Sequence, residues 1–91
     1  MASMVHQLKV EDFDEFKSVF DSDPAGRKQA AKGHMMSRSV DDPNVVFTRV
    51  EFDSLDDAKA FRDRLVASGA LDQVTVLTAP TVVELVENVT Y

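Results

Sequence analysis

Two neighbouring segments of the chain, residues 34–40 and 45–52, carry side chains that can do acid–base and binding chemistry. A histidine beside a carboxylate can act as a general acid or base near neutral pH. An arginine can orient a carboxylate or an enolate through paired hydrogen bonds. The catalytic candidates are His34, Arg38 and Arg49, and the ligand-binding candidates are His6, Met36, Phe47 and Glu51.

These two segments are predicted to form the strands of a β-hairpin. Residues 41–44, Asp-Asp-Pro-Asn, are typical of a polar turn. If the loop comprises those four residues, Val40 pairs with Val45, and alternate side chains lie on one face of the sheet. That face, turned away from the helices, then holds the pairs Arg38 with Phe47, Met36 with Arg49, and His34 with Glu51. A shift of the pairing by one residue would turn this set to the other face.

Strand and helix signals also surround the hairpin. Residues 4–10 alternate loosely between apolar and polar, which indicates a strand. A helix is predicted to start at Asp12 as its N-cap, and a second one at Ser54, each with an acidic residue three positions later. The acids of residues 11–15 and 53–57 therefore fit helix starts rather than metal ligands. The apolar stripes that these helices are expected to bury are Phe13, Phe16 and Phe20, and Leu55, Ala58, Phe61 and Leu65.

Three further segments complete the chain. Residues 25–33 carry three positive charges and no negative one, and they favour a short helix closed by Gly33. This segment is either a lid over a ligand or a solvated helical turn whose charges balance nearby acids. Residues 74–77 and, after Pro80, residues 82–89 are rich in β-branched side chains and are predicted to be strands.

The resulting order is βαββαβ with an additional C-terminal strand or extended tail. It predicts one α+β domain over residues 1–91, with a ferredoxin-like, four-stranded antiparallel sheet. Both helices would cover one face of the sheet. The remaining residues are too few to cover the apolar side chains on the other face, which would then be exposed. A second copy of the sheet is the simplest cover, so we expect a homodimer.

Composition narrows the classes of function. The chain carries 10 Lys and Arg against 16 Asp and Glu, a formal net charge of -6, and no cysteine. Disulfides, thiolate nucleophiles and cysteine-based zinc sites are therefore excluded. The acidic balance argues against nucleic-acid binding, and no apolar run is long enough to span a membrane. We expect a cytoplasmic protein with no metal ion and no cofactor.

Several candidate residues also have a purely structural interpretation. Arginine and glutamate on paired strands commonly form a salt bridge, here between subunits. His6 shares its strand face with Met4, Leu8 and Val10, which favours a core histidine beneath the helices. It joins the pocket if that face instead turns toward the dimer interior. Tyr91 either reaches a partner subunit or lies in a frayed terminus.

Residues 10–21, Gly33, residues 38–46 and residues 51–61 together resemble the dimeric α/β-barrel superfamily that includes the antibiotic-biosynthesis-monooxygenase-like proteins. The resemblance implies that two subunits pack their sheets into a barrel, often with exchanged C-terminal segments. Members of the superfamily include cofactor-free monooxygenases, haem-degrading enzymes, lactone isomerases and cyclases. The tryptophans that help form the substrate site in some members have no counterpart here, because the chain has no tryptophan.

The function implied by the resemblance is that of a small homodimeric enzyme. It would act as a cofactor-free monooxygenase, isomerase or cyclase on a small organic molecule in the cavity between two sheets. The alternative is a noncatalytic ligand-binding or protein-assembly module. In that case the same sheet face is an interface, and the basic segment 25–33 recruits an acidic partner.

Overall fold

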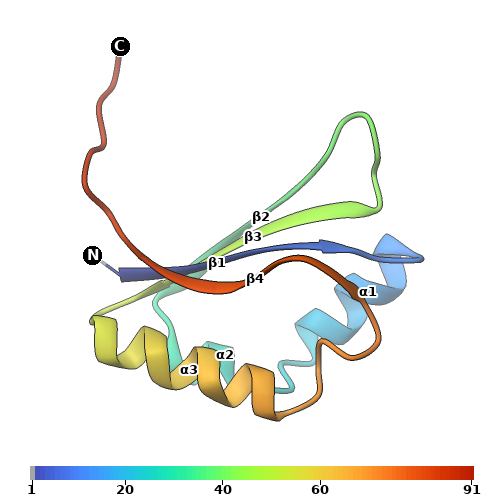
Figure 1. Cartoon of the computed structure of the whole chain (residues 1–91), viewed down its shortest axis with the longest axis horizontal. Coiled ribbons are helices and arrows are strands. Elements are labelled where there is room, and N and C mark those ends of the chain that lie inside the picture. Colours follow the sequence, from blue (N-terminus) through green and yellow to red (C-terminus); the bar gives the residue numbers. More distant parts are fainter. Residues whose placement is uncertain (1) are drawn as a thin grey trace.

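The computed structural model describes residues 2–91 and contains a four-stranded antiparallel sheet with its helices on one face (Figure 1). We call this side the helix face and the other side the open face. The strands lie in the order β2-β3-β1-β4, which is the predicted ferredoxin-like arrangement. The elements are β1 (Ala2–Lys9), α1 (Phe13–Asp21), α2 (Arg27–Ala30), β2 (Gly33–Arg38), β3 (Val45–Phe52), α3 (Leu55–Ala67) and β4 (Thr75–Glu84).

Both long helices begin where their capping residues predict. The Asp12 carboxylate accepts a hydrogen bond from the backbone N–H of Glu15 at 3.1 Å. The Ser54 hydroxyl accepts one from the backbone N–H of Asp57, also at 3.1 Å. Each cap satisfies an amide that has no partner within its helix. The two predicted helix starts are therefore confirmed.

The hydrophobic core is centred on α3 and the helix face of the sheet. Phe61 of α3 packs against Phe52 of β3, with ring centroids 5.5 Å apart, and Met4 and Ala58 are buried beside them. Burial of a large apolar side chain contributes about 1.5–3 kcal/mol. A smaller cluster of Leu8, Val10 and Val46 lies toward α1.

The helix α1 packs much less closely than α3. None of its residues is fully buried. Phe13 and Phe16 are only partly buried against the smaller cluster, so the predicted core role of the aromatic stripe is met in part. Phe20 instead contacts Arg27 and His34. This loose packing leaves space between α1 and the sheet.

The basic segment differs from its prediction. Its helix, α2, is a single turn, and Gly33 starts β2 instead of closing the helix. Asp23, which has a left-handed backbone conformation at φ 60°, holds the start of α2. Its carboxylate accepts hydrogen bonds from the backbone N–H groups of Arg27 at 2.6 Å and Lys28 at 3.1 Å.

The hairpin is shifted by one residue from its predicted register. The backbone N–H of Ser39 donates to the carbonyl oxygen of Val45 at 2.9 Å, so the turn spans residues 40–44 instead of 41–44. The Ser39 hydroxyl holds this longer turn by accepting from the backbone N–H groups of Asp41 and Asp42, each at 3.2 Å. The observed pairs are therefore Arg38 with Val46, Met36 with Thr48, and His34 with Val50.

This shift divides the predicted site between the two faces of the sheet. His34, Met36 and Arg38 lie on the helix face, opposite to the prediction. On β3, the side chains predicted for the open face do lie there. On β2, the open face instead holds two side chains that were predicted to face the helices. These open-face residues are Phe47, Arg49 and Glu51, and Met35 and Ser37.

The C-terminal part contains one strand instead of two. Strand β4 runs through Pro80 without a break. It tolerates the proline because it is an edge strand, hydrogen-bonded only to β1, and its pairing shifts twice between Val5 and Leu8 of β1. Residues 85–91 then leave the sheet as the predicted tail. The tail and the β2–β3 turn both rise on the open side (Figure 1).

Removing the cap of α1 should lower stability without changing the fold. Replacement Asp12→Ala leaves the Glu15 amide without its acceptor, so the free energy of unfolding should fall by about 1 kcal/mol. Replacement Asp12→Asn keeps an oxygen acceptor and serves as the matched control. Urea unfolding followed by circular dichroism measures both. Equal stability of the two variants would contradict a capping role.

Candidate functional site

A cavity of about 210 Å³ lies between the helix face of the sheet and the helices α1 and α3. We call it the sheet–helix cavity. Its walls are mainly apolar, and its remaining lining is mainly acidic. The apolar lining includes Leu8, Val10, Phe16, Phe20, Phe61, Leu65, Leu71 and Val74, and the charged lining comprises Glu11, Asp12, Glu15, Asp23 and Arg27.

His6 is the titratable side chain of β1 that lines this cavity. It faces the helices and is only 7% exposed. Burial lowers its pKa from 6.5 to about 4, because an apolar environment disfavours the charged imidazolium. The ring is therefore neutral at pH 7, and its Nδ1 atom is buried without a hydrogen-bond partner.

Thr48 of β3 pairs with His6 across the two central strands. It is 3% exposed, and its Oγ1 atom is likewise buried without a hydrogen-bond partner. Buried polar atoms in proteins are almost always hydrogen-bonded. His6, one of these two unsatisfied side chains, lines the sheet–helix cavity, whereas Thr48 lines the hollow on the open face, which His6 also borders.

The edge strand is irregular beside His6. Val5 pairs with Thr81, whereas Gln7 pairs with Thr78, so β4 carries one extra residue opposite His6. Ala79 and Pro80 are the two residues in that interval. Bulges of this type recur next to binding and active sites, where they redirect side chains or interrupt pairing.

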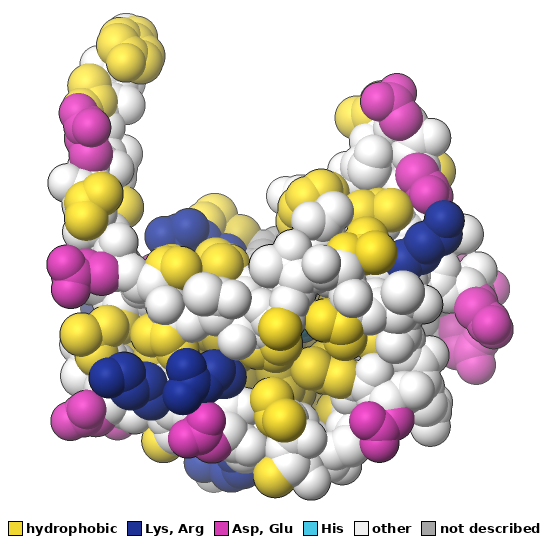
Figure 2. Space-filling model, in the orientation of Figure 1, with side chains coloured by type: hydrophobic (Ala, Val, Ile, Leu, Met, Phe, Trp, Pro, Cys, Tyr) yellow, Lys and Arg dark blue, Asp and Glu magenta, His cyan; other side chains and the backbone are white. Residues whose placement is uncertain are grey.

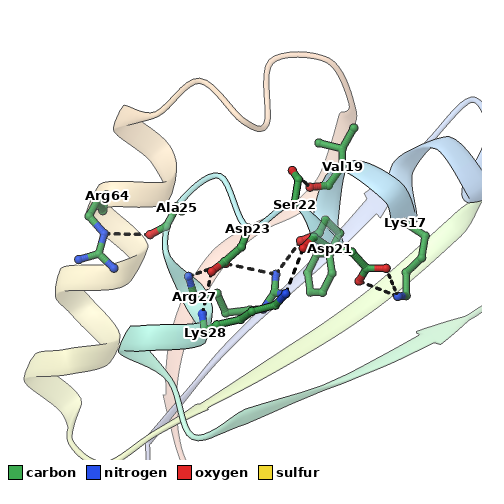
Figure 3. Close-up of polar contacts among 10 residues, drawn as sticks. Lys17, Val19, Asp21, Ser22, Asp23, Ala25, Arg27, Lys28 and Arg64 are labelled. Carbon is green, nitrogen blue, oxygen red and sulfur yellow. Dashed lines mark hydrogen bonds and ion pairs between the residues drawn. The ribbon is translucent and has the colours of Figure 1, made fainter.

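A compact network of polar contacts forms the wall between α1 and α2 (Figure 3). The guanidinium of Arg27, a residue only 6% exposed, lies 3.6 Å from the ring centroid of Phe20 and donates to the carbonyl oxygen of Phe20 at 3.2 Å. Arg64 of α3 donates to the carbonyl oxygen of Ala25 at 3.1 Å. These contacts tie the loop beside Asp23 to both long helices.

The predicted hairpin residues on the helix face do not line the sheet–helix cavity. His34 lies edge-on to Phe20, with ring centroids 5.0 Å apart, and the guanidinium of Arg38 lies 4.5 Å from the ring centroid of Phe13. Partial desolvation, with smaller contributions from the charges of Arg27 and Lys17, lowers the pKa of His34. Met36 packs against the smaller core cluster.

The other predicted residues meet on the open face. Arg49 Nε donates to Glu51 Oε1 at 3.0 Å, and Ser3 Oγ donates to Glu51 Oε2 at 2.8 Å. Phe47 and Arg49 also line a shallow hollow of about 380 Å³. The structure thus brings Phe47, Arg49 and Glu51 together, apart from His34, Met36 and Arg38.

The sequence signals identified only part of the sheet–helix cavity. His6 was among the predicted ligand-binding residues, although in the cavity of a dimer. Thr48, which lies beside His6 but does not line this cavity, gave no signal, because a threonine in a strand is ordinary. Glu11 and Glu15 were interpreted as helix-start residues, and Arg27 as part of a basic segment.

Within the described residues 2–91, no helix is long and apolar enough to cross a membrane. No three histidine, aspartate or glutamate side chains in that range come together as metal ligands would.

Acid should destabilise the fold through His6. The unfolded chain binds a proton at this ring with the ordinary pKa of 6.5, whereas the folded chain does so at about 4. Between these pH values the unfolded state binds more protons, so the free energy of unfolding should fall by about 3 kcal/mol as the pH is lowered. Urea unfolding at pH 7 and at a pH near 4 measures this change.

The matched variants for this prediction are His6→Gln and His34→Gln. The first should lose most of the acid sensitivity, and the second should keep it, because His34 is exposed. If His6→Gln keeps the full pH dependence of the wild type, the buried ring is not its source.

Comparisons with known proteins give structural matches only. No protein-family model matches the chain, and no curated protein matches it. Three solved structures named as candidate antibiotic biosynthesis monooxygenases are similar to it. The structure from Deinococcus radiodurans has a TM-score of 0.66 at 14% identity, with 100% of this chain and 98% of that chain covered.

The other two structures give the same result. The one from Bordetella bronchiseptica has a TM-score of 0.68 at 16% identity and covers 97% of both chains. The one from Nitrosomonas europaea has a TM-score of 0.51 at 15% identity, with 91% of this chain and 94% of that chain covered. The chain thus shares the ferredoxin-like α+β fold of these three structures.

Proposed function

We propose that the sheet–helix cavity binds a small, mostly apolar organic molecule with an acidic hydroxyl or C–H group, and that His6 accepts the proton. The observation that carries this proposal is the neutral, buried imidazole of His6, whose Nδ1 atom has no hydrogen-bond partner. Ligand sites commonly combine apolar walls with a few polar groups that orient the ligand. The lining of this cavity has that composition.

The chemistry follows from the environment of the ring. His6 is a weak base in an empty cavity, because burial disfavours its charged form. A ligand that gives up a proton becomes an anion beside the imidazolium, and this opposite charge stabilises the protonated ring. The proton moves to a ring nitrogen, and the electron pair stays on the ligand as a phenolate or an enolate.

Such an anion can follow two routes without a cofactor. It can form a C–O bond with dioxygen, which accepts the electron pair and takes back the proton from His6, and the resulting hydroperoxide then loses water to leave a carbonyl group. Alternatively, it can be reprotonated at another carbon, which is an isomerisation. The names of the three structures that share the fold support the first route. Both routes begin with the same proton transfer to His6.

A noncatalytic ligand-binding module is the second candidate function. Catalytic bases are commonly oriented by a hydrogen bond from a third group. Within residues 2–91, no side chain makes such a bond to Nδ1 of His6. In this case the cavity binds the ligand, and His6 only donates or accepts a hydrogen bond.

The probe 4-nitrophenol distinguishes the two candidates, because its phenolate absorbs at longer wavelength than its neutral form. At a pH where the free probe is neutral, binding to the wild-type protein should produce phenolate absorption. Replacement His6→Gln should abolish this ionisation and weaken binding by roughly fivefold, the value of about one hydrogen bond. His34→Gln, outside the cavity, is the matched control. Titrations followed by absorbance and calorimetry give both quantities.

Each outcome has a defined meaning. Saturable binding without ionisation supports the noncatalytic module. No saturable binding, or ionisation that persists in His6→Gln, contradicts the proposed role of His6.

We also propose that the open face packs against a second copy of the chain. This face carries Val5, Met35 and Phe47 and has no helix over it. The tail adds exposed apolar residues, among them Val86, which is 88% exposed. Figure 2 shows the tail and the hairpin turn as two arms that rise from the same side of the body, at its two ends. Exposed apolar surface of this kind commonly marks an interface.

A charge placed on the open face should prevent this association. Phe47→Lys buries a lysine between the two sheets, so light scattering should give the mass of one chain instead of two. Val66→Lys introduces the same charge at an exposed apolar position on α3 and should leave the dimer intact. A single-chain mass for the wild-type protein would contradict the dimer.

A further inference from the structure

We propose that the ligand of the sheet–helix cavity is an amine that is positively charged at neutral pH, with its apolar body inside the cavity and its ammonium group among the acids of the lining. This inference rests on the proposed function, since it specifies the ligand of the same cavity. The combination that points to it is an apolar interior, an unsatisfied buried histidine and a lining rich in carboxylates.

The charge of the lining is strongly one-sided. The charged side chains that line the cavity are four acids and one base, so their formal net charge, 4 negative and 1 positive, is -3. They are Glu11, Asp12, Glu15 and Asp23, and Arg27. Figure 2 shows acidic side chains gathered at the edge of the molecule near the start of α1. An approaching cation is therefore attracted to the cavity, and an anion is repelled.

Two of these acids already have partners within the fold. Asp12 caps α1 through the amide of Glu15. Asp23 accepts a hydrogen bond from the backbone N–H of Arg27 at the start of α2, and its Oδ1 atom lies 4.0 Å from Arg27 Nη1. The remaining two, the carboxylates of Glu11 and Glu15, form no hydrogen bond or ion pair with a side chain in residues 2–91. They are exposed, so both are available to a ligand.

Arg27 does not neutralise these two carboxylates. Its side chain is buried, stacks on Phe20 and donates to the carbonyl oxygen of Phe20. Its ion pair is with Asp23. The positive charge of Arg27 is therefore paired within the wall between α1 and α2. The negative charges of Glu11 and Glu15 are not balanced by it.

The interior gives the second contact point. A neutral His6 and apolar walls cannot hold an ammonium group inside, because desolvation of an unpaired charge is costly. A hydroxyl group, in contrast, can donate to the unsatisfied Nδ1 atom. The ligand that satisfies both ends has a hydroxyl at the inner end and an ammonium at the outer end.

Three phenols with the same ring and different ends test this inference on the wild-type protein. Tyramine ends in an ammonium group, 4-ethylphenol is uncharged, and 3-(4-hydroxyphenyl)propionate ends in a carboxylate. Affinities from calorimetry should decrease in that order, with about tenfold between the first and the last, as expected for exposed charges. The difference should shrink at 0.5 M salt to roughly half or less on a logarithmic scale.

The double variant Glu11→Gln and Glu15→Gln should remove most of the preference for tyramine and leave the affinity for 4-ethylphenol unchanged. The double variant Asp56→Asn and Asp63→Asn makes the same change in net charge on α3, away from the cavity lining, and should keep the preference.

The outcomes separate this inference from the proposed function. If all three phenols bind with equal affinity, or if the preference survives in Glu11→Gln and Glu15→Gln, the assignment of an amine is overturned and the cavity remains a binding site. If none of the three binds, the proposed function fails and this inference fails with it.

Discussion

Phe61 of α3 packs against Phe52 of β3, and this contact, with Met4 and Ala58 buried around it, anchors the helices to the sheet. The other long helix, α1, has no fully buried residue. One end of the helix face therefore carries the larger buried core, and the end toward α1 carries only the smaller buried cluster. The sheet–helix cavity lies between these two regions, lined by Phe16 and Phe20 of α1 and by Phe61 and Leu65 of α3.

The same difference explains the state of His6. An imidazole on a fully packed part of the sheet would need a protein partner for each buried nitrogen. Here the ring borders a cavity, so its neutral form persists without a partner from the protein at Nδ1. The wall between α1 and α2 retains its shape through Asp23 and Arg27, whose contacts are internal to that wall. The chemistry of the site is therefore concentrated in one strand residue and in the acids near the start of α1.

The sequence predicted the features that local rules determine. Asp12 and Ser54 start helices because the side-chain oxygen of each accepts a hydrogen bond from the backbone N–H three residues later. This pattern can be recognised without knowledge of the fold. The order of the strands followed from the order of the elements.

The register of the hairpin was not predictable in this way, because one serine hydroxyl decides it. The Ser39 hydroxyl accepts hydrogen bonds from two backbone N–H groups of the turn, and the turn is one residue longer than predicted. The pairing is shifted accordingly, so His34, Met36 and Arg38 lie on the helix face instead of the open face. The cavity was also beyond prediction, since it depends on how closely α1 approaches the sheet. That distance is a property of the tertiary packing and leaves no periodic signal in the sequence.

The irregular pairing of β4 has a consequence for how copies of the chain can meet. An exposed edge strand normally offers a regular row of amide and carbonyl groups to any other strand, and such rows seed fibrils. Pro80 removes one donor from this row, and the two shifts in register make its spacing uneven. Continuous sheets that grow through β4 are therefore disfavoured, so of the two edges of the sheet only that of β2 offers a regular row of backbone groups.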